Sequence, residues 1–234
     1  MSRFVIDRSF WELFPDAQIG VLLLKGYKNS SKSPAELTDM LRESNASASK
    51  YLTEEVFSEN EVVKVWREAF RKFRTKKGAR CSIEALLKRS RGDNPVHTIN
   101  PLVDIYNSAS LRYGLPVGSE DMDTFVGDLR LTVTEGNDSF RLIGDDEDSP
   151  SLPGELVYKD DAGAVCRCFN WRDGERTMIT DRTENAFLII ENIQPERLGD
   201  LEERMDFVAA NAQRYLDAKV TSRILTSAET EMEL

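Results

Sequence analysis

The sequence predicts a single domain of helices and strands in which the two kinds of element are segregated along the chain. In the first half, apolar residues recur mostly at helical spacing. Beyond Asp121 the apolar spacing changes to two, which is typical of strands that bury one face. After Pro195 a long amphipathic pattern predicts a final helix packed on the sheet. At 234 residues, the chain is long enough to bury a substantial core.

The N-terminal part begins with two predicted strands. Residues 4–6 form a short apolar run, and residues 19–24 form a nearly continuous one, which favours a central position in a sheet. The segment SPAE at residues 33–36 is a capping box with proline at the first helical position. A helix is therefore expected to begin there and to end near residues 44–49.

Two basic helices are predicted next. The apolar pattern that starts at Glu61 is helical and stops at Gly78. Ser82 is expected to cap a short second helix, which ends with Lys88 and Arg89 in its last turn, where cations suit the helix dipole. The first half of the chain is thus predicted to be mostly helical.

Charge is unevenly distributed along the chain. The net charge is −10, but residues 64–91 hold eleven basic and two acidic residues, a local charge of +9, so the remainder carries about −19. A basic segment on an otherwise acidic protein is typical of a nucleic-acid footprint, and the alternative is a solvated basic helix without a partner. The residues expected to contact RNA are Arg67, Arg71, Lys72, Arg74, Lys76, Lys77, Arg80, Lys88, Arg89 and Arg91.

The following helix carries a polar side. Asn100 caps it, Pro101 takes its first position and Gly114 follows its end. Asn100, Asp104 and Asn107 recur at steps of four and three on one face, while another face is apolar. Polar groups on so apolar a helix must face water or be hydrogen-bonded where they are buried. They form either a satisfied network that braces the next loop or the wall of a pocket for a small polar ligand.

The second half is predicted to contain two hairpins, a buried strand and the final helix. The first hairpin turns at residues 136–138 and the second at residues 160–163. The acidic tail after Ile224 is expected to fray. The predicted strands are residues 129–134, 139–143, 155–158, 164–169 and 186–190.

Composition gives no sign of a metal, a cofactor or a membrane span. The three cysteines are an odd number without the spacing of a disulfide framework, which fits a reducing cytoplasm. Cys166 and Cys168 lack a second ligand pair, and His97 is the single histidine, so no metal site is expected. No apolar run approaches the roughly 20 residues that span a bilayer, and the N-terminus lacks the pattern of a signal peptide.

Four segments carry a resemblance to a known family. They are WREAFRKF (66–73), SIEALLKRSRGD (82–93), NPLVDIYNSASLRYGLPVGSED (100–121) and PGELVYKD (153–160), the last with FNWRDG (169–174) and Thr180. The chain resembles, over residues 15–192, the B3/B4 domain of the bacterial phenylalanyl-tRNA synthetase β-subunit in its freestanding form. The resemblance implies an α+β fold with a mixed β-sheet core and flanking helices, as one domain over residues 1–226 with an acidic tail at 227–234.

The resemblance also implies a function. In the synthetase this domain hydrolyses tyrosine from mischarged tRNA, so the chain is expected to be a trans-acting aminoacyl-tRNA editing hydrolase in the cytoplasm. An ordered water and dipoles aimed at the developing oxyanion can perform such ester hydrolysis without a metal or a protein nucleophile. Gly118 stands where the synthetase loop carries a histidine, and no catalytic residue is assigned.

Ten residues are expected to line the substrate pocket. Glu155 would pair with the α-ammonium of an amino acid or open a strand as an exposed charge, and Trp171 would stack on a base or an aromatic side chain or lie in the core. His97 would act as a general base or lie in a loop. The expected pocket residues are Asn100, Asp104, Asn107, Ser110, Gly118, Asp121, Glu155, Trp171, Arg172 and Thr180.

Two alternatives to the hydrolase remain open from the sequence. The chain would otherwise be a non-catalytic module that binds tRNA, another structured RNA or a free amino acid. It would alternatively be an interaction protein whose basic face meets the acidic face of a second copy. The sequence leaves the oligomeric state, the amino acid and the tRNA unassigned.

Overall fold

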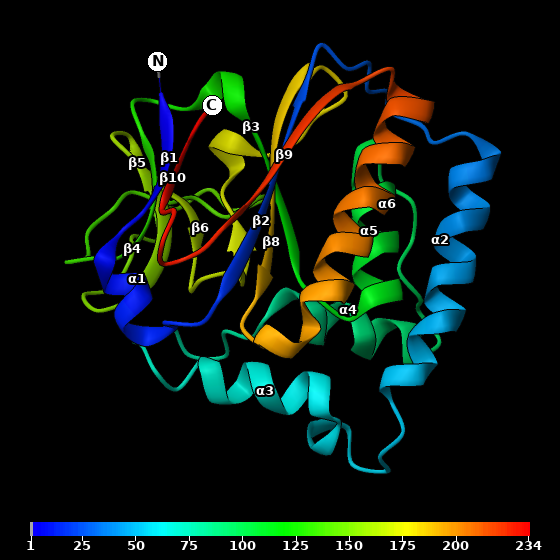
Figure 1. The fold of residues 1–234 in the computed structure, drawn as a ribbon, viewed down its shortest axis with the longest axis horizontal. Coiled ribbons are helices and arrows are strands. Elements are labelled where there is room, and N and C mark those ends of the chain that lie inside the picture. The colour runs from blue at the N-terminus through cyan, green and yellow to red at the C-terminus, as the bar shows by residue number, and fades with distance from the viewer. Residues whose placement is uncertain (1) are drawn as a thin grey trace.

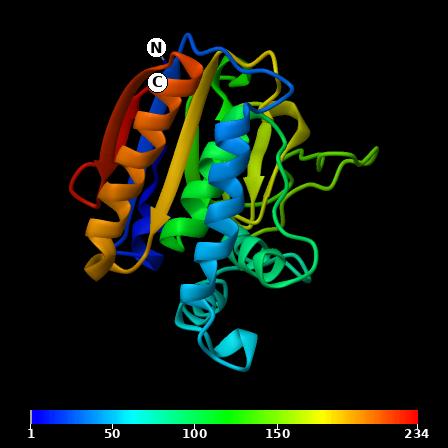
Figure 2. The ribbon, with the colours of Figure 1, turned by 90° about the vertical axis from the view of Figure 1, so that its right-hand side faces the viewer.

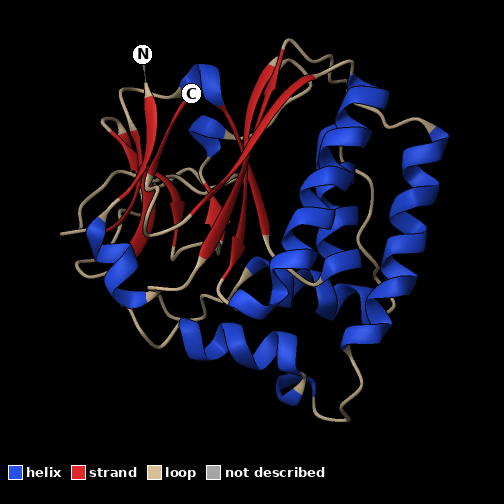
Figure 3. Ribbon diagram, in the orientation of Figure 1, coloured by secondary structure: helices blue, strands red, loops and turns tan. Residues whose placement is uncertain are grey.

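The computed structural model describes residues 2–234 as an α+β fold with two β-sheets and flanking helices, which confirms the predicted fold class (Figures 1 and 3). Both sheets are antiparallel except for one parallel pair, β1 with β4. The four-stranded sheet has the order β3 (Val117–Asp121), β8 (Asn185–Asn192), β2 (Gln18–Lys25) and β9 (Lys219–Leu225). The six-stranded sheet has the order β10 (Glu231–Glu233), β1 (Arg3–Ile6), β4 (Leu129–Val133), β5 (Leu156–Asp160), β6 (Gly163–Arg167) and β7 (Arg172–Asp173).

Most of the helices lie on one face or at the lower end of the four-stranded sheet, whereas α1 packs against β4 of the six-stranded sheet (Figures 1 and 2). In Figure 1, α2, α5 and α6 stand to the right of this sheet, and α3 runs below both sheets. The α-helices are α1 (Arg8–Leu13), α2 (Ala35–Ser47), α3 (Glu61–Ala69), α4 (Ser82–Arg91), α5 (Pro101–Tyr113) and α6 (Leu198–Leu216). Short 3₁₀ turns lie at Ala48–Tyr51, Phe57–Glu59, Met122–Thr124, Glu175–Thr177 and Pro195–Arg197.

Strand β2 shows why the four-stranded sheet is a middle layer. Ile19, Val21 and Leu23 pack in the core between the two sheets, whereas Leu22 and Leu24 pack in the core beneath α5 and α6. Successive strand side chains point to opposite faces, so a continuous apolar run supplies both cores. The structure thus has three layers, in the order helices, four-stranded sheet, six-stranded sheet.

The predicted helix starts need correction. Helix α2 begins where expected, but Ser33 does not cap it, because the Ser33 hydroxyl donates to the Asp104 carboxylate instead. Helix α4 includes Ser82, whose hydroxyl finds no partner within residues 2–234, so it does not cap that helix either. Helix α3 ends at Ala69 and not at Gly78, because the chain leaves the helix to bond the six-stranded region through the Arg74 N–H.

The prediction of a hairpin between residues 129–134 and 139–143 is wrong. Strand β4 pairs instead with β5, and residues 139–143 form no extended strand. The Asp138 carboxylate accepts hydrogen bonds from Thr134 and Ser151, which turns the chain away from β4 and leaves that edge for β5. The second predicted hairpin, β5 with β6, is present.

The prediction that the C-terminal tail frays is also wrong. Strand β9 runs to Leu225, and residues 231–233 form β10, which pairs antiparallel with β1. Met232 lies opposite Phe4 and is buried in the core between the sheets. The acidic side chains of β10 remain exposed on either side of this methionine. Successive side chains of a strand point to opposite faces, so an acidic segment can bury its methionine and keep its glutamates in solvent.

Candidate functional site

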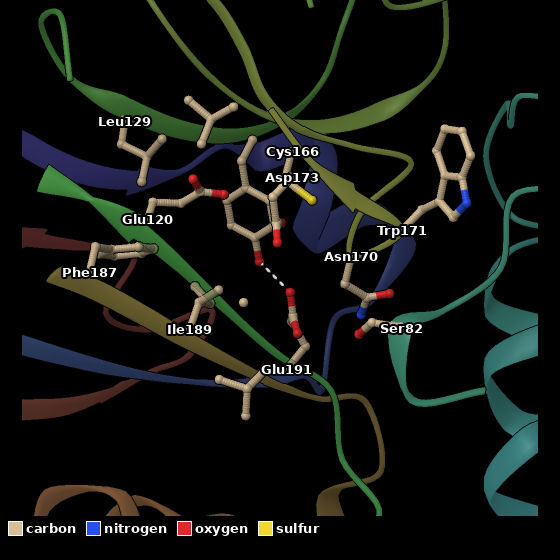
Figure 4. A pocket seen from close by; sticks show the side chains of 14 residues that line it. Ser82, Glu120, Leu129, Cys166, Asn170, Trp171, Asp173, Phe187, Ile189 and Glu191 are labelled. Atoms are coloured by element: carbon tan, nitrogen blue, oxygen red, sulfur yellow. Dashed lines mark hydrogen bonds between the residues drawn. The ribbon is translucent and has the colours of Figure 1, made fainter. Parts of the chain in front are cut away.

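A small polar cavity lies between the two sheets (Figure 4). Strands β3 and β8 form one wall and β4 to β7 the other, and the start of α4 closes one side. Its volume is about 40 Å³, which corresponds to about three water molecules. The polar side chains that line it are Ser82, Glu120, Tyr158, Cys166, Asn170, Trp171, Asp173 and Glu191.

Alternation along β8 places a carboxylate in this cavity. Phe187, Ile189 and Glu191 face the six-stranded sheet, whereas the residues between them face the helices. On the neighbouring strand, Gly118 lies opposite Ile189 and Glu120 lies opposite Phe187, so both point to the same side. A Cβ at Gly118 would lie 3.2 Å from Cγ2 of Ile189, so glycine leaves space in the cavity that a side chain would fill.

Glu191 and Tyr158 form a hydrogen bond across the cavity. The Tyr158 hydroxyl donates to Oε1 of Glu191 at 2.8 Å, the bond that the dashed line in Figure 4 marks. Oε2 of Glu191 is buried and has no hydrogen-bond partner within the described chain. Burial raises the pKa of Glu191 to about 7. This carboxyl therefore changes its protonation state close to neutral pH.

Glu120, Asp173 and Cys166 form a second group in the cavity lining. Burial, followed by the charge of Asp173, raises the pKa of Glu120 well above its usual value, and burial also raises the pKa of Asp173. These shifts favour protonated carboxyls, which can donate hydrogen bonds to a ligand. Burial raises the pKa of the Cys166 thiol as well, so this cysteine stays in its weakly nucleophilic thiol form.

A strained turn delivers Asn170 and Trp171 to the cavity. Cys168 and Phe169 both have positive φ, 49° and 64°, a conformation that costs free energy for residues other than glycine. Glu155 fixes this turn by accepting hydrogen bonds from the Cys168 N–H at 2.9 Å and from Nη2 of Arg167 at 2.7 Å. Burial opposes ionisation of Glu155, but the bonds from Arg167 and from a backbone N–H hold its pKa below the usual value.

Several buried polar atoms in the cavity have no partner. Within residues 2–234 these are Oγ of Ser82, Oε2 of Glu120, Oε2 of Glu191 and both polar side-chain atoms of Asn170. Figure 4 shows Ser82 and Asn170 on the same side of the cavity as Glu191, with the Trp171 indole turned away. An unpaired buried polar group costs about 1–3 kcal/mol, and native proteins rarely leave one unexplained. Their convergence here is what a polar ligand or a set of bound waters would satisfy.

A larger groove along α4 adjoins the cavity. The groove has a volume of about 890 Å³ and shares Ser82, Val117, Trp171 and Asp173 with the cavity. The cations that line it are Arg80, Lys88, Arg89 and Arg172. Four cations, together with the carboxyl groups of Glu84 and Asp173, therefore line a groove beside the acidic cavity.

Four of the ten expected pocket residues meet at this site. Gly118 lines the cavity, Asn107 and Arg172 line the groove, and Trp171 lines both. Asn107 comes from the middle of α5, and the other three come from β3 and from the turn into β7.

The other six lie outside both linings. Asn100 caps α5 by accepting from the Val103 N–H at 3.0 Å, and Ser110 accepts from Nη2 of Arg204 at 2.8 Å. Asp104 accepts from Ser33 and from the Ile99 N–H. Asp121 and Thr180 both bond Thr183 in a loop network, and Glu155 holds the strained turn described above. His97, which contacts Asn94 in an exposed loop, is likewise not part of the cavity lining.

The expected RNA-contacting residues divide by their partners. Arg67 is paired with Glu84 at 2.6 Å, Lys72 bonds the Leu13 carbonyl, and Lys76 bonds Ser149. Arg80 and Arg89 line the groove and bond only backbone carbonyls. Over residues 2–234, no side-chain hydrogen bond or ion pair is made by the exposed cations Arg71, Arg74, Lys77, Lys88 and Arg91.

Sequence reasoning missed the carboxyls and the tyrosine of the cavity. Glu191 is at the end of the most hydrophobic strand of the second half, at an even spacing from Phe187 and Ile189. A carboxylate on the buried face of such a strand is costly unless it is paired or functional. That spacing is the signal that could have identified Glu191 before the fold was known.

Comparison with known proteins assigns the chain to a family. A model of the B3/4 domain matches residues 65–228, and the chain belongs to the B3/4 domain family. Two relatives are phenylalanine–tRNA ligase beta subunits. The one from Psychrobacter arcticus is 31% identical over 117 residues, and the one from Mycoplasma pneumoniae is 25% identical over 123 residues. These matches cover 50% and 53% of this chain but only 14% and 15% of the relatives.

A solved structure is also similar. It is an N-terminal fragment of the phenylalanyl-tRNA synthetase beta-subunit from Pyrococcus horikoshii, with a TM-score of 0.46 and 11% identity, and the match covers 93% of this chain and 49% of the fragment. The family assignment rests on the sequence matches.

Residues 2–234 contain neither a cluster of metal ligands nor a membrane-spanning helix. No group of three or more histidine, cysteine, aspartate or glutamate side chains is arranged to hold a metal ion. No helix in this range is long and apolar enough to cross a membrane.

Proposed function

We propose that the chain binds the acceptor end of aminoacylated tRNA and, acting in trans, hydrolyses the ester of a mischarged amino acid. The observation that carries this proposal is the acidic cavity with its unpaired polar atoms, which lies beside a groove whose lining includes four cations. The groove suits the phosphates of the acceptor end, because cations lower the free energy of a bound polyanion. The family supports the same substrate, since the two relatives are named for the aminoacylation of tRNA.

Glu191 is the proposed general base of the reaction. General-base catalysis is most effective when the pKa of the base lies near the working pH, and the pKa of Glu191 is about 7. Its free Oε2 would accept a proton from a water molecule, whose oxygen attacks the ester carbonyl. As the tetrahedral intermediate collapses, the carbon–oxygen bond to the ribose breaks, and Glu191 returns the proton to the leaving ribose oxygen, which releases the ribose hydroxyl and the free amino acid.

Donors in the cavity wall would stabilise the developing oxyanion. Ser82 and Asn170 present an unpartnered hydroxyl and an unpartnered amide, and the raised pKa of Glu120 favours the protonated form of its carboxyl. Fixed donors in a water-poor site stabilise a developing charge more strongly than solvent does. The strained turn held by Glu155 keeps one of these donors, Asn170, in place.

Deacylation of a panel of mischarged tRNAs by the purified chain tests the proposal. We expect at least one ester to be hydrolysed faster than in buffer, and Glu191→Gln to lower that rate by about 100-fold or more. The matched control is Glu202→Gln, which changes an exposed carboxylate on α6. Hydrolysis of every ester at the buffer rate would overturn the proposal.

A non-catalytic binding module is the second candidate function. The observation that favours it is Gly118, which lines the cavity without a side chain that could take part in chemistry. If the chain binds aminoacylated tRNA saturably at low salt but protects the ester from hydrolysis, this second function holds. Hydrolysis by the wild type above the buffer rate, together with loss of that activity in Glu191→Gln, would instead support the hydrolase.

A further inference from the structure

Tyr158 limits what the cavity can accept. We propose that this tyrosine is a specificity-determining residue and that the cavity accepts only small amino acids, with side chains the size of those of alanine or serine. The inference rests on the proposed function, because it names the class of ester that the same site would hydrolyse. Three observations support it: the small volume of the cavity, the close packing around the Tyr158 ring, and the hydrogen bond from the Tyr158 hydroxyl to Glu191.

The remaining space fits a small group only. The cavity volume of about 40 Å³ corresponds to about three water molecules. A methyl or hydroxymethyl side chain has one or two heavy atoms, whereas a cavity that binds benzene has a volume of about 150 Å³. The cavity would have to grow before it could hold an aromatic side chain.

The ring of Tyr158 is packed on both faces. It stacks between Phe4 and Phe169, with ring centroids 6.2 Å and 6.4 Å away and interplanar angles of 22° and 20°. The residue belongs to β5, whose neighbours β4 and β6 pair with it on both edges. The side chain is almost fully buried. A rotation of the ring out of the cavity would therefore disrupt close packing, which protein cores resist.

The Tyr158 hydroxyl also occupies one oxygen of the Glu191 carboxyl. It donates to Oε1 of Glu191, so the protein's own phenol fills the space beside this carboxylate. What stays free for a ligand is Oε2 of Glu191, with Ser82 and Asn170 beside it. In the proposed reaction these groups serve the attacking water and the oxyanion, so the remaining space suits only a short side chain.

A matched set of esters tests the inference. One tRNA is charged with alanine, serine, phenylalanine or tyrosine, and each ester is incubated with the full chain. We expect kcat/KM for the alanyl and seryl esters to exceed that for the tyrosyl ester at least tenfold. Tyr158→Ala should raise hydrolysis of the tyrosyl ester at least tenfold, and Tyr158→Phe, which keeps the ring, should not. A wild-type chain that hydrolyses tyrosyl and alanyl esters equally fast would overturn the inference.

A binding measurement separates this inference from the proposed function. The probe is p-cresol, which matches the side chain that Tyr158→Ala removes. We expect saturating p-cresol to raise the Tm of Tyr158→Ala by about 3 °C and to leave the wild type unchanged. If all four esters are inert, the proposed function fails. The p-cresol measurement still tests whether Tyr158 closes the cavity to aromatic groups, because an equal rise in the Tm of the wild type would refute that claim. Tyr158→Leu serves the same purpose if Tyr158→Ala does not fold.

Discussion

Two buried carboxylates, Asp104 in the first turn of α5 and Glu191 in the cavity, show what distinguishes a structural polar group from a functional one. Both are fully buried, and burial raises the pKa of each. Asp104 accepts from a hydroxyl and a backbone N–H, one on each oxygen, whereas Glu191 has one oxygen bonded and the other unpaired. The sequence shows both as a carboxylate among apolar residues, and only the hydrogen-bond partners tell them apart.

The largest loss of stability is expected from replacing Glu155, the buried carboxylate that pairs with Arg167. Glu155→Ala leaves Arg167 without its partner while both sites are closed to solvent. Breaking a buried pair in this way costs about 3–5 kcal/mol. Urea unfolding should show this loss of stability, and Glu155→Gln, which keeps an acceptor oxygen, should lose less. A loss below about 1 kcal/mol would show that the pair does not hold the turn.

Stability is expected to fall as pH rises from 5 to 8. The folded-state pKa of Glu191 is about 7 against an ordinary 4.5, so the folded chain binds more protons than the unfolded chain between these values. The stabilisation is present below pH 4.5 and is lost as pH passes through 7, by on the order of 3 kcal/mol. Urea unfolding at a series of pH values measures it. Glu191→Gln should flatten the decline, and an unchanged slope in that variant would contradict the assignment.

Asp104→Ala should destabilise the chain without changing its chemistry. The substitution leaves the Ile99 N–H and the Ser33 hydroxyl without their acceptor, which costs about 1–3 kcal/mol. Unfolding and deacylation are measured on the same sample, with Asp104→Asn as the variant that keeps one acceptor oxygen. A rate that falls while stability is retained would place Asp104 in the functional site and break the comparison.

A smaller effect is expected from the cations of the groove. Charge reversal at Arg80 and Lys88 should weaken tRNA binding at low salt and reduce the salt slope by about one for each lost phosphate contact. The matched control reverses Lys25 and Lys219, a pair of exposed lysines at the ends of β2 and β9. Equal losses in both double variants would mean that the groove contributes no specific contact.

Local signals in the sequence predicted most of the fold. The apolar run of β2 and the Asn100-Pro101 start of α5 are present where the pattern placed them, because period and capping act over a few residues. The errors came from partners distant in sequence. Ser33 bonds Asp104 instead of its own helix, and β10 is ordered by pairing with β1 at the other end of the chain.

The candidate site was harder to predict than the fold. The polar stripe of α5 contributed one residue, Asn107, to the groove, because its other members found partners at the helix start and on α6. The cavity is built from Glu120, Tyr158 and Glu191, which lie on three strands and face one another only after the sheets stack. Alternation along a strand determines on which face of its sheet each side chain lies, but it does not determine which faces of the two sheets pack together.

The pH dependence of deacylation by the wild-type chain tests most directly the claim that the unpaired carboxylate is the functional one. The rate should rise with pH and level off above an apparent pKa near 7, because Glu191 must be ionised to accept a proton from water. In Glu191→Gln the pH profile of the residual rate should show no inflection near pH 7. A wild-type profile without an inflection between pH 6 and 8, or the same inflection in Glu191→Gln, would contradict the account.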